Sequence, residues 1–303
     1  MKIGFLNLLS LRKIRTLKHL LTYLIFLCSF VLFSQSNTEI FMFDLKLAQD
    51  NIEVSNMINI SNNDGYDNQP FFENDTIIYY SSNRNGQTDI LKYNRFNDSK
   101  QFINNSDGSE YSPQKIPKSN KLSAIRLDTD GAQNFYTFDL NDGQAYRIKT
   151  NLIIAYYTWL DNETIVSAVI EGDALNLFTI NTKNGKSQKL ENRVGRSFQK
   201  IPKTNLISFI SKEDEKDWKI KTFNPINGHA QIITSTLNNQ EDIYWLSTNT
   251  IITSKNSVLY KYTLGKSSEW EQFTDLKSRG LLNTTRMRSN TKNTKLLIVA
   301  EQQ

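Results

Sequence analysis

The sequence is poor in the side chains on which much enzyme chemistry depends. Its 303 residues include one cysteine and two histidines, and both Cys28 and His19 lie within the first 36 residues. The rest of the chain has no cysteine, which excludes a disulfide framework, a zinc-thiolate site, a thiol nucleophile and a cysteine-ligated cluster. Any Ser-His-Asp arrangement or histidine-ligated metal would depend on His229 alone.

Acidic side chains are missing from the start of the chain. The first acidic residue is Glu39, and five basic residues precede it: Lys2, Arg12, Lys13, Arg15 and Lys18. These five account for the whole formal net charge of +5, since the remainder holds 31 basic and 31 acidic residues. Nucleic-acid binding needs a clustered basic surface. We therefore expect no nucleic-acid partner.

The same N-terminal segment predicts export. Residues 20–33 are an uninterrupted run of mostly apolar side chains, flanked by the basic segment and by Ser34-Gln35-Ser36. This pattern is typical of a secretory signal peptide at residues 1–36, and the run is shorter than the ~20 residues that cross a bilayer as a helix. Retention as an N-terminal anchor is the alternative. Cys28 lacks the small preceding residues of a lipidated cysteine.

The predicted mature chain, residues 37–303, is a single exported domain without a membrane span. A cysteine-free exported chain fits a bacterial periplasm or cell surface, or secretion from a bacterium. After residue 40 no helical periodicity appears, and Gly, Asn and Asp clusters separate short β-branched or aromatic runs. These features predict an all-β fold.

Two signatures repeat along the chain. The first is an apolar residue, two others, a large apolar residue and usually Asp or Asn, and it begins at Ile40, Ile90, Phe135, Leu177, Ile220 and Leu259. The second is a short apolar strand at 77–80, 122–125, 165–169, 206–210, 251–253 and 296–299. Successive copies lie about 40–50 residues apart, the period of β-propeller blades with four strands each.

The order of the signatures predicts how the ring closes. The first signature opens the series unpartnered at Ile40, and the second closes it unpartnered at Leu296. Pairing the N-terminal strands with the C-terminal strands would complete one blade and leave no open sheet edge. We therefore predict a six-bladed β-propeller closed in this way.

The first full repeat also resembles a known family. It contains Gly65-Tyr66-Asp67-Asn68-Gln69-Pro70, then 82–90 with the sequence SNRNGQTDI. These residues resemble the WD40-like (PD40) repeats of TolB-like propellers, closely over 64–95 and less closely over 106–140. TolB itself has a further N-terminal α/β domain that meets its Tol partners. Too few residues precede the first repeat for such a domain, so we expect no strict Tol-Pal role.

Several residues that suggest chemistry are better interpreted as structural. His229 follows an Asn-Gly turn between the third and fourth strands of a blade, which predicts an exposed turn residue. Asp128-Thr129-Asp130-Gly131 resembles the start of a calcium loop but lacks the closing bidentate Glu, so turn chemistry is favoured. In the run 82–89, no helix follows to hold a phosphate, and we expect Arg84 and Asp89 to brace the turn or to pair with a neighbouring blade.

Large side chains near the innermost strands are expected to pack between blades. They are Trp159, Trp245, Phe72 and Phe198. The charged run 212–217 is interpreted as a solvated hairpin loop.

Loops that enter the innermost strands converge on one mouth of a propeller channel and form the candidate binding site. They carry tyrosine, arginine, acidic and amide side chains: Tyr66, Asp67, Asn68, Glu110, Tyr111, Tyr156, Tyr157, Arg196, Glu241, Asp242, Arg286 and Arg288. Tyr and Arg are enriched in interaction hot spots. The alternative is that these side chains only satisfy the loop backbones.

The scarcity of catalytic side-chain types favours a non-catalytic propeller that binds an envelope protein, peptide or glycan. Such a protein needs no cofactor. The alternative is a hydrolase, lyase or lactonase that uses carboxylates, with calcium as a candidate cofactor. A third hypothesis is a structural module of the envelope that is held by partner proteins. The oligomeric state stays open.

Overall fold

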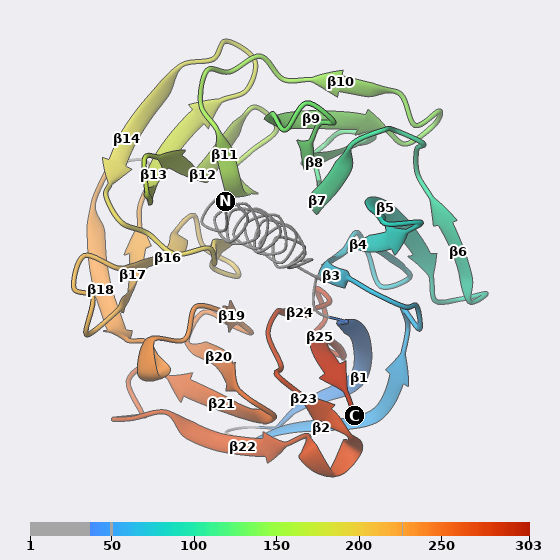
Figure 1. Cartoon of the computed structure of the whole chain (residues 1–303). Coiled ribbons are helices and arrows are strands. Elements are labelled where there is room, and N and C mark those ends of the chain that lie inside the picture. The colour runs from blue at the N-terminus through green and yellow to red at the C-terminus, as the bar shows by residue number, and fades with distance from the viewer. Residues whose placement is uncertain (1–36, 49–50, 226) are drawn as a thin grey trace, which may run out of the picture. The chain divides into compact units, whose positions relative to one another are not determined.

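Six antiparallel sheets are arranged as blades around a central axis (Figure 1). The computed structural model describes residues 37–48, 51–225 and 227–303, so the predicted signal peptide lies outside the described residues. The predicted six-bladed propeller is confirmed.

Each blade is listed here from its innermost strand outwards. The first blade contains β3 (Asp67–Phe72), β4 (Ile77–Arg84), β5 (Gln87–Asn94) and β6 (Ser99–Phe102). The second contains β7 (Ser109–Lys115), β8 (Lys121–Leu127), β9 (Gln133–Asp139) and β10 (Ala145–Arg147). The third contains β11 (Ile154–Trp159), β12 (Thr164–Glu171), β13 (Ala174–Asn181) and β14 (Ser187–Glu191).

The fourth blade contains β15 (Gln199–Lys200), β16 (Ile207–Ser211), β17 (Lys219–Phe223) and β18 (Ala230–Ser235). The fifth contains β19 (Ile243–Trp245), β20 (Thr250–Lys255), β21 (Val258–Thr263) and β22 (Glu271–Asp275). The sixth contains β24 (Met287–Ser289), β25 (Lys295–Gln302), β1 (Glu39–Ala48) and β2 (Asn51–Asn59), and β23 (Leu281–Leu282) pairs with the end of β25. Two short 3-10 helices are η1 (Leu237–Asn239) and η2 (Lys277–Arg279).

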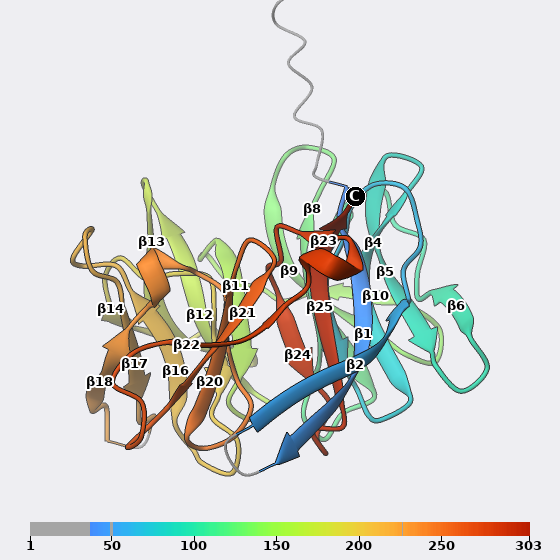
Figure 2. The ribbon, with the colours of Figure 1, turned by 90° about the horizontal axis from the view of Figure 1, so that it is seen from below.

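The sixth blade closes the ring as the order of the signatures predicted. Strand β1 pairs antiparallel with β25, with Ile40 opposite Val299, and β2 pairs with the outer side of β1. Figure 2 shows β1 and β2 beside β25. The first and last strands of the described residues therefore share one sheet, which removes the edges that an open ring would expose.

The repeated signatures are the second and third strands of the blades. The copies at 77–80 and at Ile90 lie in β4 and β5, and those at 296–299 and Ile40 lie in β25 and β1. The second strands are nearly continuous apolar runs because each sheet packs against a blade on both faces. Tyr79 of the first blade, for example, packs in one core cluster with Leu122 and Phe138 of the second.

Glutamine side chains join neighbouring inner strands. Gln69 accepts a hydrogen bond from the backbone N–H of Ser112 at 2.7 Å, and Gln114 donates one to the carbonyl of Tyr157 at 2.6 Å. Gln199 both donates to the carbonyl of Trp245, at 2.9 Å, and accepts from its N–H, at 2.7 Å. These bonds satisfy backbone groups across blade boundaries and hold the strands that surround the axis.

The turn residues behave as the sequence indicated. His229 is exposed in the turn between β17 and β18. Arg84 Nε lies 2.6 Å from Asp89 Oδ2, which braces the turn between β4 and β5. Within that turn Asn85 and Gly86 have φ of 55° and 83°, a region that asparagine and glycine tolerate.

One other sequence interpretation agrees with the packing. Trp159 and Trp245 are buried in clusters that join neighbouring blades. The described part of the chain contains no helix long and apolar enough to cross a membrane.

Candidate functional site

A hollow on the propeller axis is lined by the inner-strand segments of all six blades, and we call it the central hollow. These segments are 69–71, 112–114, 156–157, 196–199, 242–244 and 286–288. Its volume is about 90 Å³. Half of the twelve predicted binding residues line it, namely Tyr156, Tyr157, Arg196, Asp242, Arg286 and Arg288. Side chains far apart in the sequence therefore meet at one place.

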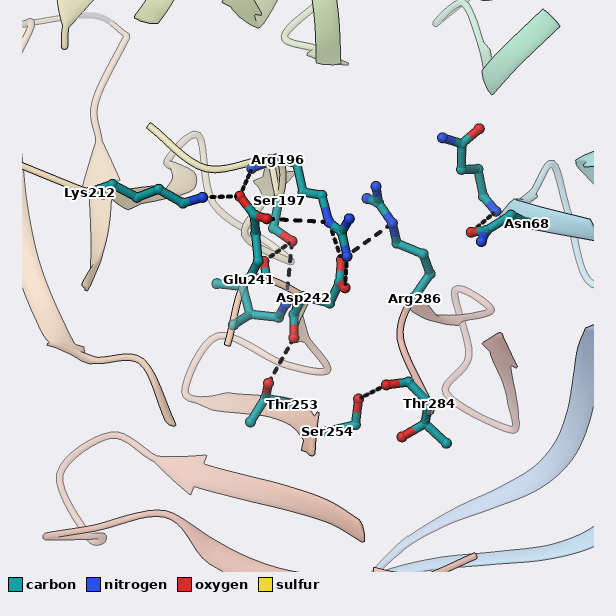
Figure 3. Close-up of polar contacts among 12 residues, drawn as sticks. Asn68, Arg196, Ser197, Lys212, Glu241, Asp242, Thr253, Ser254, Thr284 and Arg286 are labelled. Carbon is teal, nitrogen blue, oxygen red and sulfur yellow. Dashed lines mark hydrogen bonds and ion pairs between the residues drawn. The ribbon is translucent and has the colours of Figure 1, made fainter. Parts of the chain in front are cut away.

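Asp242 is the negative centre of the hollow (Figure 3). Arg196 donates to it from Nε at 3.2 Å and from a terminal nitrogen, and Arg286 Nε lies 3.3 Å from its Oδ1. Burial opposes ionisation of the carboxyl, but Arg286 and Arg196 outweigh burial and hold the pKa of Asp242 below its usual value. Asp242 is therefore an ionised anchor for two arginines.

A second acidic residue, Glu241, orders the loop beside this anchor. Lys212 Nζ lies 2.5 Å from Glu241 Oε1, and the backbone N–H of Arg196 donates to the same oxygen at 3.2 Å. Ser197 donates to the carbonyl of Glu241 at 2.7 Å. These contacts hold the segment that carries Arg196 against the segment that carries Asp242, across a blade boundary.

Lys212 and Ser197 were missed from the sequence. Lys212 was placed in a solvated loop, but its ammonium lies 3.9 Å from the ring centroid of Trp218 and pairs with Glu241. The rest of the loop, 213–216, is exposed as predicted. The position of Lys212 directly after β16 could have indicated that its side chain contacts the blade and does not extend into solvent. Ser197 follows Arg196 in a segment that was already a candidate.

Arg288 differs from the other arginines of the hollow. Its guanidinium lies 4.8 Å from the ring centroid of Phe71 on the neighbouring blade. Among the described residues its side chain has no hydrogen-bond or ion-pair partner. Burial lowers its pKa, since the surrounding protein disfavours a charge without a counterion.

Tyrosines form the rim of the hollow. Tyr66 and Tyr111 meet edge to face, with ring centroids 6.2 Å apart. Arg286 lies 5.5 Å from the ring centroid of Tyr156. Burial raises the pKa of Tyr66 to about 12, although Arg286 opposes that change. Tyr66 is therefore neutral at neutral pH, and the three rings offer apolar faces and hydrogen-bonding tips.

Tyr157 has a structural role. It is 3% exposed, and its hydroxyl donates to the carbonyl of Ser112 at 2.9 Å and bonds Ser123 Oγ at 2.8 Å. Its hydroxyl therefore joins the second and third blades, while its backbone lines the hollow.

Asp67 and Glu110 lie between blades and are fully buried. Burial raises the pKa of Asp67 to about 7, with nearby Glu39 adding to the effect. Burial likewise raises the pKa of Glu110 to about 7, and a hydrogen bond with Asp89 acts in the same direction. Both carboxyls are thus held inside the fold, away from a ligand at the mouth.

The remaining predicted residue, Asn68, is half-buried and accepts a hydrogen bond from the backbone N–H of Gln69 at 2.7 Å (Figure 3). Its side chain therefore supports its own loop.

No group of three or more acidic or histidine side chains suited to a metal ion occurs among the residues that the structure describes. In the calcium-like loop, Asp128 accepts hydrogen bonds from Arg126 at 2.5 Å and Asn134 at 2.6 Å. Asp130 accepts one from the N–H of Ala132 at 2.9 Å. These carboxylates have the partners of a turn, and the loop does not fit a calcium site.

Comparison with solved structures identifies the fold. TolB from Acinetobacter baumannii superposes with a TM-score of 0.58 at 11% identity, over 88% of this chain and 64% of that chain. A protein assigned as TolB from Agrobacterium tumefaciens gives 0.67 at 10% identity, over 87% and 98%. The fold is that of the TolB propellers.

A solved enzyme is also similar in fold. Oligogalacturonate lyase from Vibrio parahaemolyticus has a TM-score of 0.53 at 11% identity, over 83% of each chain. No protein-family model and no curated protein matches the sequence. The chain spans about 64% of the length of the Acinetobacter TolB. At these identities the likeness establishes the fold alone.

Proposed function

We propose that this TolB-like propeller is exported to the bacterial cell envelope and binds a protein, peptide or glycan there without catalysis. The binding site is the central hollow and its tyrosine rim. The observation that supports this most is the convergence of Arg196, Arg286, Arg288 and Tyr156 from three blades on one hollow. Arginine and tyrosine combine charge, hydrogen bonding and flat apolar surface, which suits recognition.

The pKa values and the burial of the carboxyl groups around the hollow favour a binding function over carboxylate-based catalysis. A general acid and base need carboxyls with pKa values near the working pH, within reach of a substrate. Asp242 lies in the hollow but is kept ionised by two arginines. Asp67 and Glu110 have raised pKa values but are fully buried between blades. Among the residues that the structure describes, no such acid-base pair therefore faces the hollow.

Capture of a partner tests the proposal. Tagged residues 37–303 are incubated with the envelope fraction of the source cells, and retained components are identified by mass spectrometry and then titrated in purified form. The double variant Tyr111→Ala/Arg286→Ala should lose capture at a temperature where circular dichroism shows it folded, because Arg286 also pairs with Asp242 and its loss lowers the melting temperature. Arg147→Ala, at an exposed position on the outer strand β10, is the matched control. Equal capture by the double variant would exclude the hollow as the binding face.

A further inference from the structure

The charges around the central hollow do not balance. Arg196 and Arg286 share Asp242, and Lys212 pairs with Glu241. Among the described residues Arg288 has no carboxylate partner, although the ring of Phe71 lies 4.8 Å from its guanidinium and the phenols of Tyr244 and Tyr157 are close by. A half-buried cation without a counterion is costly, and an anion that entered the hollow would relieve that cost.

Arg288 lies where two hollows meet. A second hollow, of about 460 Å³, is lined by the turns at 200–203, 245–248 and 289–293. Phe71, Gln199, Tyr244 and Arg288 line both hollows. Arg288 therefore borders both hollows, and a ligand held there could extend into the larger one.

The strand geometry places a second arginine nearby. Arg286 and Arg288 are two residues apart at β24, so their side chains leave the same face of the strand, with Cα atoms roughly 7 Å apart. Both belong to the lining of the central hollow. A guanidinium binds a planar carboxylate through two parallel N–H donors, which a point charge such as lysine cannot match.

We propose that the central hollow binds a carboxylate of a peptide ligand, with Arg288 as its principal partner and Arg286 as the second cation. This inference rests on the proposed binding function and specifies its ligand. The central hollow has room for a few water molecules at about 90 Å³. It therefore suits a carboxylate at a chain end or on a short side chain. Phe71 and Tyr244 supply apolar contacts for the adjoining residues.

The experiment compares two forms of one probe. A pool of random hexapeptides is prepared as free acids and as C-terminal amides, and binding to residues 37–303 is measured by affinity selection and titration. Preferential binding of the free acids by about tenfold or more would identify a chain-end carboxylate. Equal binding of both forms, with selection of Asp or Glu inside the peptides, would identify a side-chain carboxylate. Selection independent of either carboxylate would overturn the inference.

Substitutions then assign the role to Arg288. Arg288→Gln should weaken binding of the selected peptide by about tenfold or more, and Arg288→Lys should restore part of the loss. Arg147→Gln removes the same charge from the exposed outer strand and should leave binding unchanged. Acetate should compete with the peptide for the wild-type protein, and acetamide should not. Unchanged affinity in Arg288→Gln, or equal competition by both small molecules, would overturn the assignment.

The same assays separate this inference from the proposed function. If peptides bind the hollow without needing a carboxylate or Arg288, the binding function stands and the carboxylate assignment falls. If acidic sugars bind through Arg288 but no peptide does, the peptide assignment falls. If neither the peptide pool nor an envelope partner binds, both the proposed function and this inference fail.

Discussion

The guanidinium of Arg196 donates two hydrogen bonds to the carboxylate of Asp242, 46 residues further along the chain and in the next blade. Arg286 reaches the same carboxylate from the sixth blade. This cluster ties three successive blades together at the axis, so it supports both the fold and the candidate site.

Replacing Asp242 by Asn should destabilise the protein by about 1–3 kcal/mol, because two guanidinium groups lose their shared counterion. Denaturant unfolding at neutral pH measures the change. Since the pKa of Asp242 is lowered in the folded state, its contribution is present above the unfolded pKa near 4 and declines as pH falls through the folded value. The difference between wild type and Asp242→Asn should therefore shrink in acid. A constant difference down to acid unfolding would contradict this account.

Asp67 should have the opposite dependence on pH. Its folded pKa of about 7 exceeds the ordinary value of 3.8, so its favourable contribution is complete below the lower value and is lost as pH rises towards 7. We define the effect of Asp67→Asn as the free energy of unfolding of the variant minus that of the wild type. This difference should be more favourable at pH 8 than at pH 5 by more than about 1 kcal/mol. Unfolding free energies at the two pH values measure this effect. The exposed Asp107→Asn is the control, and the same response in both variants would exclude burial of Asp67 as the cause.

The glutamine bridges should contribute measurably to stability. Gln199 satisfies both the N–H and the carbonyl of Trp245, so Gln199→Ala should cost about 1–3 kcal/mol by leaving buried backbone groups unpaired. Gln188→Ala, at an exposed position on β14, should change stability by less than about 0.5 kcal/mol. Thermal and urea unfolding provide the comparison. Equal effects at the two positions would show that the bridge is dispensable.

Ring closure should depend on the apolar contacts of β1. Phe41 is fully buried where β1 meets β25, whereas Phe96 is 90% exposed in a turn. Phe41→Ala should cost about 3–5 kcal/mol through lost burial and the cavity it leaves, and Phe96→Ala should be close to neutral. Measured unfolding free energies decide. A small loss for Phe41→Ala would mean that the closing blade is not part of the cooperative fold.

Much of the architecture was predictable because blade signals are local. The apolar second and third strands, such as 77–80 and the segment from Ile90, recur at a nearly constant period. Their order indicated that the N-terminal strands pair with the C-terminal strands, and the structure adds the register, with Ile40 opposite Val299. Turn chemistry at Asn85-Gly86 and the exposed position of His229 follow from short-range backbone preferences. Export by a signal peptide at 1–36 remains a prediction from the same sequence.

The site was predictable only as a set of loops. Sequence placed Asp67, Glu110 and Asp242 in equivalent loops, yet the first two are buried between blades and the third lies in the hollow with two arginines. Lys212 was missed because its partner Glu241 lies in another blade.

The sequence by itself determined the number of blades, their order and the balanced charge of the predicted mature chain, since these follow from composition and periodic pattern. Only the tertiary structure decided which charges pair and which stay unpaired. Arg196 and Arg288 have the same side chain in similar inner-strand positions. One pairs with Asp242, and the other lies against the ring of Phe71 with no carboxylate partner among the described residues. That difference arises from contacts between blades, which no local pattern encodes.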